Sequence, residues 1–292
     1  MKIVFAYGSM CLIWGTTWLA IKVSLRTTPV FTGVGFRFVL AGLLLYAAAL
    51  VMRRRISFTD LPWKLIGVLA FTFFGLNYVL TYMAETHLAS GLVAVLFGTL
   101  PFFTFGLAHF MVGERTTPFT WLGAALAFGG VAVISLAGTA TASAWYAVAA
   151  IGAAILSAFG SVYTKKHAHH DPLEFLPPSM LGAGIVLAFI GIIREHPTGA
   201  AFSHSALPAM LYLAIAGSGV AFFLNMWLLQ RIEVWVVGLS TLIIPVLAVL
   251  VGILWGGEVF NVRDLVGAAL VIIGVWLALS RQGRPEALRV EG

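Results

Sequence analysis

Ten apolar segments, each long enough to cross a lipid bilayer, follow one another along the chain with short polar gaps between them. A helix of about 20 apolar residues spans the hydrocarbon core of a membrane. Backbone N–H and C=O groups find no water there, so a spanning segment outside a β-barrel must be helical. The pattern predicts spans at residues 3–23, 31–51, 63–84, 88–110, 119–137, 145–164, 174–193, 208–229, 234–255 and 264–280. We therefore expect an all-α integral membrane protein.

The composition excludes most other classes of protein. Charged residues make up 10% of the chain, against about 25% in a soluble domain. The net charge of +6 does not indicate a nucleic-acid partner, because the basic residues lie in the gaps between spans, as Arg53 and Lys165 do. Metal-ligand spacing and a P-loop are lacking, and the histidines of residues 167–170 are typical of a solvated loop. We expect no cofactor, no metal and no obligatory protein partner.

Lysine and arginine are distributed unequally between the two sets of loops. With the N-terminus in the cytoplasm, twelve of them fall on the inside and four on the outside, and Arg37 lies within a span. Basic residues are enriched in cytoplasmic loops. The count predicts that both termini are cytoplasmic.

The second half of the chain repeats the first at an offset of 144 residues. Between residues 101 and 131, nine of 31 positions are identical to their counterparts, without a gap. The matches include Pro101 with Pro245, Glu114 with Glu258, and Gly130 with Gly274. A self-match of this length predicts a tandem duplication. We assign one repeat to residues 1–138, a second to 145–282, and a cytoplasmic tail to 283–292.

Each repeat contains five predicted spans, which is an odd number. The second repeat must therefore cross the membrane in the opposite direction to the first. Inverted repeats form alternating-access carriers, because one packing arrangement used in two directions gives two similar end states. We expect a transporter rather than an enzyme.

Several motifs resemble a known family. Trp14-Gly15-Thr16-Thr17-Trp18, followed by Lys22, Pro29 and Arg37, is similar to the start of an EamA-type repeat, and so is the series from Pro101 through Gly113-Glu114-Arg115 to Gly130. These repeats belong to the drug/metabolite transporter superfamily. The resemblance covers residues 3 to 280 and implies a ten-helix, two-repeat exporter in the bacterial plasma (inner) membrane. Within the superfamily, the chain resembles the bacterial YddG-type exporters of aromatic and other neutral amino acids.

Polar and aromatic residues recur on helix faces at membrane depth, where a transport site should lie. Amide and hydroxyl groups could hold an amino-acid backbone, and aromatic and methionine side chains could accommodate varied side chains. The candidate substrate-binding residues are Thr17, Trp18, Asn77, Tyr78, Thr81, Tyr82, Ser161, Tyr163, Asn225 and Met226.

Two prolines mark candidate gating positions. Pro101 and Pro245 are predicted near the middle of spans four and nine, where each would remove a backbone hydrogen bond and kink the helix. Gly98 and Ser240 precede them and would allow a helix or a ligand to approach closely. This placement predicts a cavity beside both prolines.

Few charged residues lie within the predicted membrane spans. We expect Arg37 to pair with Glu85 at the outer end of span three, although it could instead snorkel outward or hold a substrate carboxylate. Glu114 and Glu258 precede the next predicted helices and should cap them. The predicted spans lack an acidic residue at their centres, so we expect transport to be facilitative, or else coupled through a group that the sequence does not identify.

The sequence therefore predicts a carrier that exports small neutral metabolites, aromatic and other neutral amino acids foremost. A sugar-phosphate or nucleotide-sugar exchanger is one alternative, but it should carry two or more central basic residues. Another metabolite or drug exporter is a second alternative. A membrane lipid-modifying enzyme is a third, and it would need convergent catalytic groups near one interface.

Overall fold

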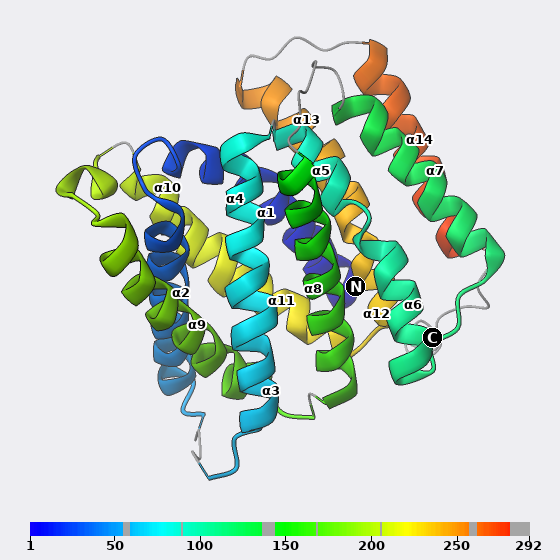
Figure 1. Ribbon diagram of the computed structural model, residues 1–292. Helices are drawn as coiled ribbons and strands as arrows, with labels where there is room; N and C mark the ends of the chain where they lie inside the picture. The colour runs from blue at the N-terminus through cyan, green and yellow to red at the C-terminus, as the bar shows by residue number, and fades with distance from the viewer. Residues whose placement is uncertain are drawn as a thin grey trace.

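A computed structural model describes residues 1–54, 59–88, 90–135, 144–167, 169–204, 206–256 and 262–280. Within these residues the regular elements are all helical (Figure 1). The first half contains α1 (Lys2–Ser24), α2 (Val30–Val51), α3 (Trp63–Val68), η1 (Leu69–Leu76), α4 (Asn77–His87), α5 (Ser90–Phe97), α6 (Leu100–Val112) and α7 (Pro118–Ser135). The second contains α8 (Ala144–His167), α9 (Pro172–Glu195), η2 (Gly199–Phe202), α10 (Leu207–Tyr212), η3 (Leu213–Val220), α11 (Ala221–Leu229), α12 (Val234–Gly238), α13 (Ser240–Gly256) and α14 (Val262–Ser280).

Helices occupy all ten of the predicted intervals. Among the described residues, seven helical segments are long and apolar enough to cross a membrane, and three further apolar helices are shorter. The shorter ones are Pro118–Val133, Val234–Leu247 and Leu265–Ser280. The all-α prediction is confirmed for the described residues, and ten membrane crossings stay a prediction.

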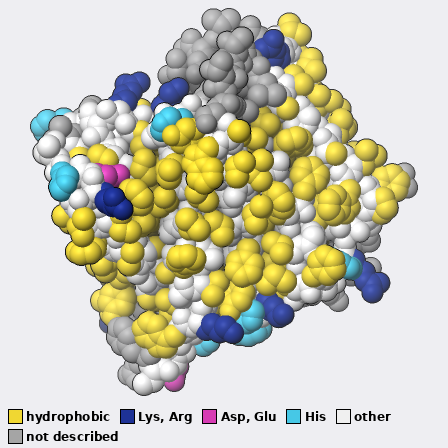
Figure 2. Space-filling view, viewed as in Figure 1, with side chains coloured by type: hydrophobic (Ala, Val, Ile, Leu, Met, Phe, Trp, Pro, Cys, Tyr) yellow, Lys and Arg dark blue, Asp and Glu magenta, His cyan; other side chains and the backbone are white. Residues whose placement is uncertain are grey.

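Large apolar side chains cover the outside of the molecule. Phe5, Phe110, Phe189 and Trp276 are more than half exposed. Figure 2 shows hydrophobic side chains across the middle of one face, with lysine and arginine toward its edges. A soluble monomer rarely exposes such a surface, whereas lipid covers it without cost.

The two halves carry the same irregularities at the same offset. The π-helices η1 and η3 begin 144 residues apart, and so do α3 and α10, which precede them. Widened π turns are rare and occur mostly at functional sites. Here each lies in the middle of a long span, Trp63–His87 in one half and Leu207–Leu229 in the other.

Corresponding helices of the two halves pack against each other. In Figure 1, α2 lies along α9 on one side of the molecule and α7 lies along α14 on the other. At the second crossing, a Cβ atom on Gly130 would come within 2.5 Å of the Gly267 carbonyl oxygen, and one on Gly274 within 2.5 Å of the Gly123 oxygen. These four glycines are two pairs related by the 144-residue offset. Small residues let membrane helices approach to backbone contact.

The prolines of spans four and nine are not placed equivalently, contrary to the prediction of two mid-span kinks. Span four is interrupted at Gly98 and Thr99, and Pro101 lies in the first turn of α6. A proline there loses no hydrogen bond, because the first N–H groups of a helix have no intrahelical partner. Pro245 lies inside α13, and the interruption of span nine precedes it at Leu239.

Glu114 caps a helix, but not the one that follows it in sequence. Its carboxylate accepts hydrogen bonds from the backbone N–H groups of Val234 at 3.0 Å and Trp235 at 3.5 Å. It therefore closes the N-terminus of α12 in the other half. Sequence neighbourhood pointed to α7, whereas the fold brings the end of α6 against α12. The counterpart Glu258 lies outside the described residues.

Candidate functional site

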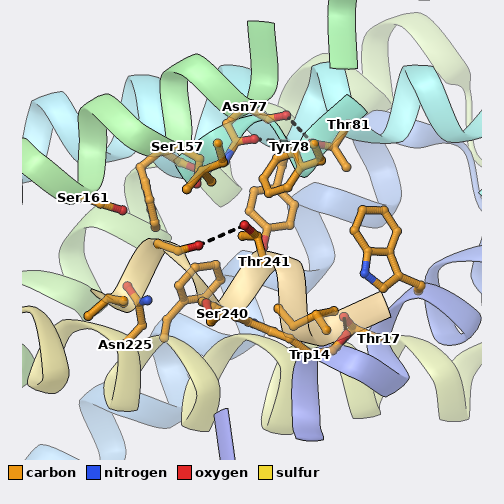
Figure 3. A pocket seen from close by; sticks show the side chains of 18 of the residues that line it. Trp14, Thr17, Asn77, Tyr78, Thr81, Ser157, Ser161, Asn225, Ser240 and Thr241 are labelled. Atoms are coloured by element: carbon orange, nitrogen blue, oxygen red, sulfur yellow. Dashed lines mark hydrogen bonds between the residues drawn. The ribbon is translucent and has the colours of Figure 1, made fainter. Parts of the chain in front are cut away.

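A cavity of about 100 Å³ lies between the two halves (Figure 3). The first half contributes to its wall from α1, α2, η1, α4, α5 and α6, and the second from α8, α11, α12 and α13. The lining residues are Trp14, Thr17, Trp18, Ile21, Arg37, Phe73, Asn77, Tyr78, Thr81, Phe97, Leu100, Ser157, Ser161, Phe222, Asn225, Val237, Gly238, Ser240, Thr241, Ile244 and Pro245. An apolar wall with a few convergent polar groups is typical of a small-molecule site.

Nine of the predicted residues line this cavity together. They are Thr17, Trp18, Asn77, Tyr78, Thr81, Ser161, Asn225, Ser240 and Pro245. Figure 3 shows Asn77, Tyr78 and Thr81 on one side, and Asn225 and Ser240 across from them. That these residues contact a substrate stays a prediction.

The other five predicted residues are not part of the cavity wall. Tyr82 and Met226 are packed in the core, and Tyr163 stacks on His167 with ring centroids 4.1 Å apart. Gly98 and Pro101 lie at the interruption of span four, beside the lining residues Phe97 and Leu100. Side chains four residues apart lie on one stripe of a helix. This spacing does not predict which residues of the stripe face the cavity.

Helix geometry arranges the polar groups of the first half. Thr81 Oγ1 donates to the Asn77 carbonyl oxygen at 2.9 Å and to Asn77 Oδ1 at 3.3 Å. Asn77 Nδ2 donates to the carbonyl oxygen of Phe73 at 3.1 Å. Phe73 belongs to the π-helix η1, whose ladder is widened. The amide of Asn77 is thereby held in one orientation at the wall.

Asn225 presents an acceptor from the second half. Its side chain is buried, and Nδ2 donates to Met10 Sδ at 3.6 Å. Its Oδ1 atom is buried and has no hydrogen-bond partner among the residues that the structure describes. An unsatisfied buried amide oxygen costs free energy, so a donor from a ligand or a water in the cavity would stabilise this arrangement.

Arg37 does not pair with Glu85 as the sequence predicted. Its Nε atom donates to Ser218 Oγ at 2.6 Å, and Nη2 donates to the Gly217 carbonyl oxygen at 3.3 Å. Nη1 donates to the Tyr82 hydroxyl at 3.4 Å. The prediction chose a partner in the same half of the chain. The fold instead brings η3, about 180 residues away in sequence, against α2.

A second side chain reaches the same point on η3. Trp14 Nε1 donates to the Gly217 carbonyl oxygen at 3.3 Å, and its ring meets Phe222 edge-on at 5.4 Å. The carbonyl of Gly217 thus accepts from residues of α1 and α2. Several lining residues were not among the predicted substrate-binding residues. Trp14 and Ser157 lie one helical turn from the predicted Trp18 and Ser161, whereas no spacing in the sequence indicated Phe222.

Comparison with known proteins places the chain in a family. The model of the EamA-like transporter family matches residues 1–136 and again 144–280. The "Uncharacterized inner membrane transporter YedA" of Escherichia coli K12 is 28% identical over 274 residues, which cover 93% of this chain and 89% of that protein.

Two relatives carry names that mention amino acids. The "Probable terminal-alkyne amino-acid exporter" of Streptantibioticus cattleyicolor is 29% identical, covering 94% of this chain and 93% of that protein. The "Probable amino-acid metabolite efflux pump" of Salmonella typhimurium is 26% identical, covering 91% and 90%.

A solved crystal structure shares the fold. It superposes with a TM-score of 0.82 at 21% identity, and the match covers 95% of this chain and 97% of the other. The two matches to the family model span nearly all of the chain, and the exposed apolar surface is that of a protein in lipid. The chain is therefore a multi-pass membrane protein with two EamA repeats, and it belongs to the EamA-like transporter family.

Proposed function

We propose that this chain exports neutral amino acids, aromatic ones among them, across the bacterial inner membrane. Export would proceed by alternating access of the central cavity, in a ten-span protein with both termini in the cytoplasm and its second repeat inverted. The observation that carries this proposal is a cavity whose wall comes from both halves and combines aromatic rings with neutral hydrogen-bonding groups. A site between two related halves can open to either side when the halves rock against each other.

The lining matches the two parts of such a substrate. Trp18 and Phe97 meet edge-on at 6.4 Å, and Phe73 and Phe222 at 5.6 Å. Rings in these arrangements offer faces and edges to an aromatic or aliphatic side chain. The Asn225 oxygen and the hydroxyls of Ser157 and Ser161 are positioned at the wall to accept and donate hydrogen bonds. The names of the amino-acid exporters among the relatives point to the same class of substrate.

Transport is facilitative in this proposal. None of the described residues that line the cavity is an aspartate or a glutamate. A proton-coupled carrier needs a group at membrane depth that binds and releases the proton. Substrate should therefore equilibrate across the membrane without accumulating under a pH gradient. Accumulation that an uncoupler abolishes would contradict this part of the proposal.

The alternatives fit the cavity less well. A sugar-phosphate or nucleotide-sugar carries two or more negative charges, and Arg37 is the single basic residue among the described lining positions. A lipid-modifying enzyme needs converging catalytic groups. The histidines at the cytoplasmic loop diverge instead, since His167 contacts the Tyr163 carbonyl and His170 contacts Glu174.

Counterflow in proteoliposomes tests the proposal. Vesicles preloaded with unlabelled compound are diluted into trace labelled Trp, Phe, Leu, a sugar phosphate or a lipid precursor. Transient uptake of the three amino acids, and of neither of the other compounds, is the expected result. Exchange of the sugar phosphate without exchange of any amino acid would refute the proposed substrate class.

A further inference from the structure

Arg37 is a buried cation whose described partners are all neutral. Its side chain is 1% exposed, and it lies about 10 Å along α2 from the start of that helix. Hydroxyls of Ser218 and Tyr82 and the carbonyl of Gly217 accept its hydrogen bonds. The ring of Tyr78 lies 4.8 Å from the guanidinium carbon. A charge at membrane depth is costly unless something compensates it, and hydroxyls and a ring face compensate it only in part.

The hydrogen-bonding capacity of the guanidinium is not used up. An arginine side chain has five N–H donors in a planar fork. Three are directed to Ser218, Tyr82 and Gly217, one from each nitrogen. One N–H therefore remains on each of Nη1 and Nη2. Two parallel donors are what a carboxylate needs for a bidentate pair.

The fold does not require a cation at this place. In α2 and α9 the packing glycines match at an offset of 149 residues, Gly35 with Gly184 and Gly42 with Gly191, and at that offset the counterpart of Arg37 is Val186. At the 144-residue offset of η1 and η3, the counterparts of Gly217 and Ser218 are Phe73 and Phe74. The positions equivalent to the cation and to two of its partners are thus apolar in the other repeat. A charge that appears on one side only is better explained by a ligand than by the architecture of the repeat.

Arg37 also lines the central cavity, next to Tyr78. We infer that Arg37 binds the carboxylate of the transported substrate, so that the site selects monocarboxylates and discriminates against amines that lack one. This inference rests on the proposed function and specifies which end of the substrate the protein recognises. When the carboxylate binds, it supplies the counter-charge that the described surroundings of Arg37 lack.

The Asn225 oxygen, which has no hydrogen-bond partner among the described residues, also belongs to the cavity wall. Asn225 is seven residues beyond Ser218 along η3 and α11, which corresponds to about 10 Å of helix. The carboxylate is bound near Arg37, and the Asn225 oxygen is left for a donor elsewhere on the substrate or for water.

Binding of two simple analogues tests the inference without depending on flux. 3-Phenylpropionate keeps the ring and the carboxylate but has no amine, and 2-phenylethylamine keeps the ring and the amine but has no carboxylate. Stabilisation of the purified wild-type protein against heat reports binding of each. We expect the carboxylate to bind at least tenfold more tightly than the amine. Equal affinities, preference for the amine, or no binding of the carboxylate would overturn the inference.

Variants assign the effect to the residue. Arg37→Gln should lose the preference for 3-phenylpropionate, and Arg37→Lys should keep part of it, because lysine retains the charge without the fork. Arg194→Gln removes an exposed cation at the end of α9 and should leave the preference unchanged. If Arg37→Gln does not fold, the wild-type comparison and Arg37→Lys still decide the question.

The outcome separates this inference from the proposed function. Suppose that amino acids exchange in vesicles, but the protein binds phenylethylamine as tightly as phenylpropionate. This result would support the proposed export and contradict the role of Arg37. Carboxylate-selective binding without exchange of any amino acid would support the role of Arg37 and contradict the proposed export.

Discussion

Glu114 connects the two halves through one carboxylate. It lies in the loop after α6 and accepts N–H groups at the start of α12. The Lys165 ammonium of α8 donates to the Ile232 carbonyl oxygen, 2.8 Å away, just before the same helix. Three segments of the chain therefore meet at this end of the molecule. We expect the carboxylate to fix α12, and with it the cavity-lining Val237 and Gly238.

Removing that acceptor should destabilise the protein. Glu114→Ala leaves the buried N–H of Val234 without its partner, and the expected loss is about 1–2 kcal/mol. Thermal or denaturant unfolding in detergent measures it. Glu174→Gln changes a half-exposed carboxylate that contacts His170 and should change stability by less than about 0.5 kcal/mol. Equal effects of the two substitutions would mean that the cap contributes nothing specific.

Glu114 should also make the stability of the protein depend on pH. Burial raises the pKa of the Glu114 carboxyl above its ordinary value, against the opposing effects of the two backbone N–H groups and Lys165, while nearby Glu233 raises it further. Between the ordinary and the raised pKa, the folded protein holds a proton that the unfolded chain has released. The contribution of Glu114 to stability therefore falls as pH rises through this window.

Comparison with Glu114→Gln isolates that contribution. As pH rises from about 4 to 7, the unfolding midpoint of the wild type should fall relative to that of Glu114→Gln. A difference that does not vary with pH, or one that shifts in favour of the wild type, would show that the carboxyl pKa is not raised.

At the scale of helices, α7 and α14 depend on backbone contact. Gly130→Ala and Gly274→Ala would each force a Cβ against backbone that lies about 2.5 Å away, so each should cost about 1–3 kcal/mol. Gly129 is the adjacent residue, and a Cβ there would meet no atom within 4 Å. Gly129→Ala should therefore be neutral or slightly stabilising. Unfolding midpoints compare the three variants, and similar losses in all three would contradict this account of the crossing.

Hydropathy predicted the helical segments within a few residues, because a bilayer fixes both the length and the composition of a span. The 144-residue offset matches Gly123 with Gly267 and Gly130 with Gly274, but a sequence match alone does not predict that α7 and α14 are in contact there. The interruption of span four was not predicted. Pro101 is compatible with a mid-span kink and with a first helical turn, and only the packing around it selects the second.

Side-chain partners were predictable only where they are local in sequence. Asn77 and Thr81 are one helical turn apart and do interact. The contacts of Arg37 with Ser218 and of Glu114 with Val234 join residues more than 100 positions apart in the chain. The sequence suggested partners within the first half for both residues, and no spacing in a single sequence predicts contacts between segments so far apart.

At the scale of the whole molecule, we propose that substrate passes through the cavity between the two halves. Ser161 lines that cavity from α8 (Figure 3), and Ser280 is exposed at the end of α14. Ser161→Trp should fill the cavity, whereas Ser280→Trp adds the same side chain where indole rings are tolerated at a membrane interface. Both variants should reach the membrane in similar amounts if the difference lies in transport alone.

Counterflow of labelled phenylalanine into vesicles preloaded with phenylalanine measures whether this cavity is the transport path. We expect wild type and Ser280→Trp to exchange at rates within about twofold of each other, and Ser161→Trp to fall by tenfold or more, because a bulky side chain in a packed site excludes the substrate. Exchange by Ser161→Trp at the wild-type rate would contradict the claim that this cavity is the transport path.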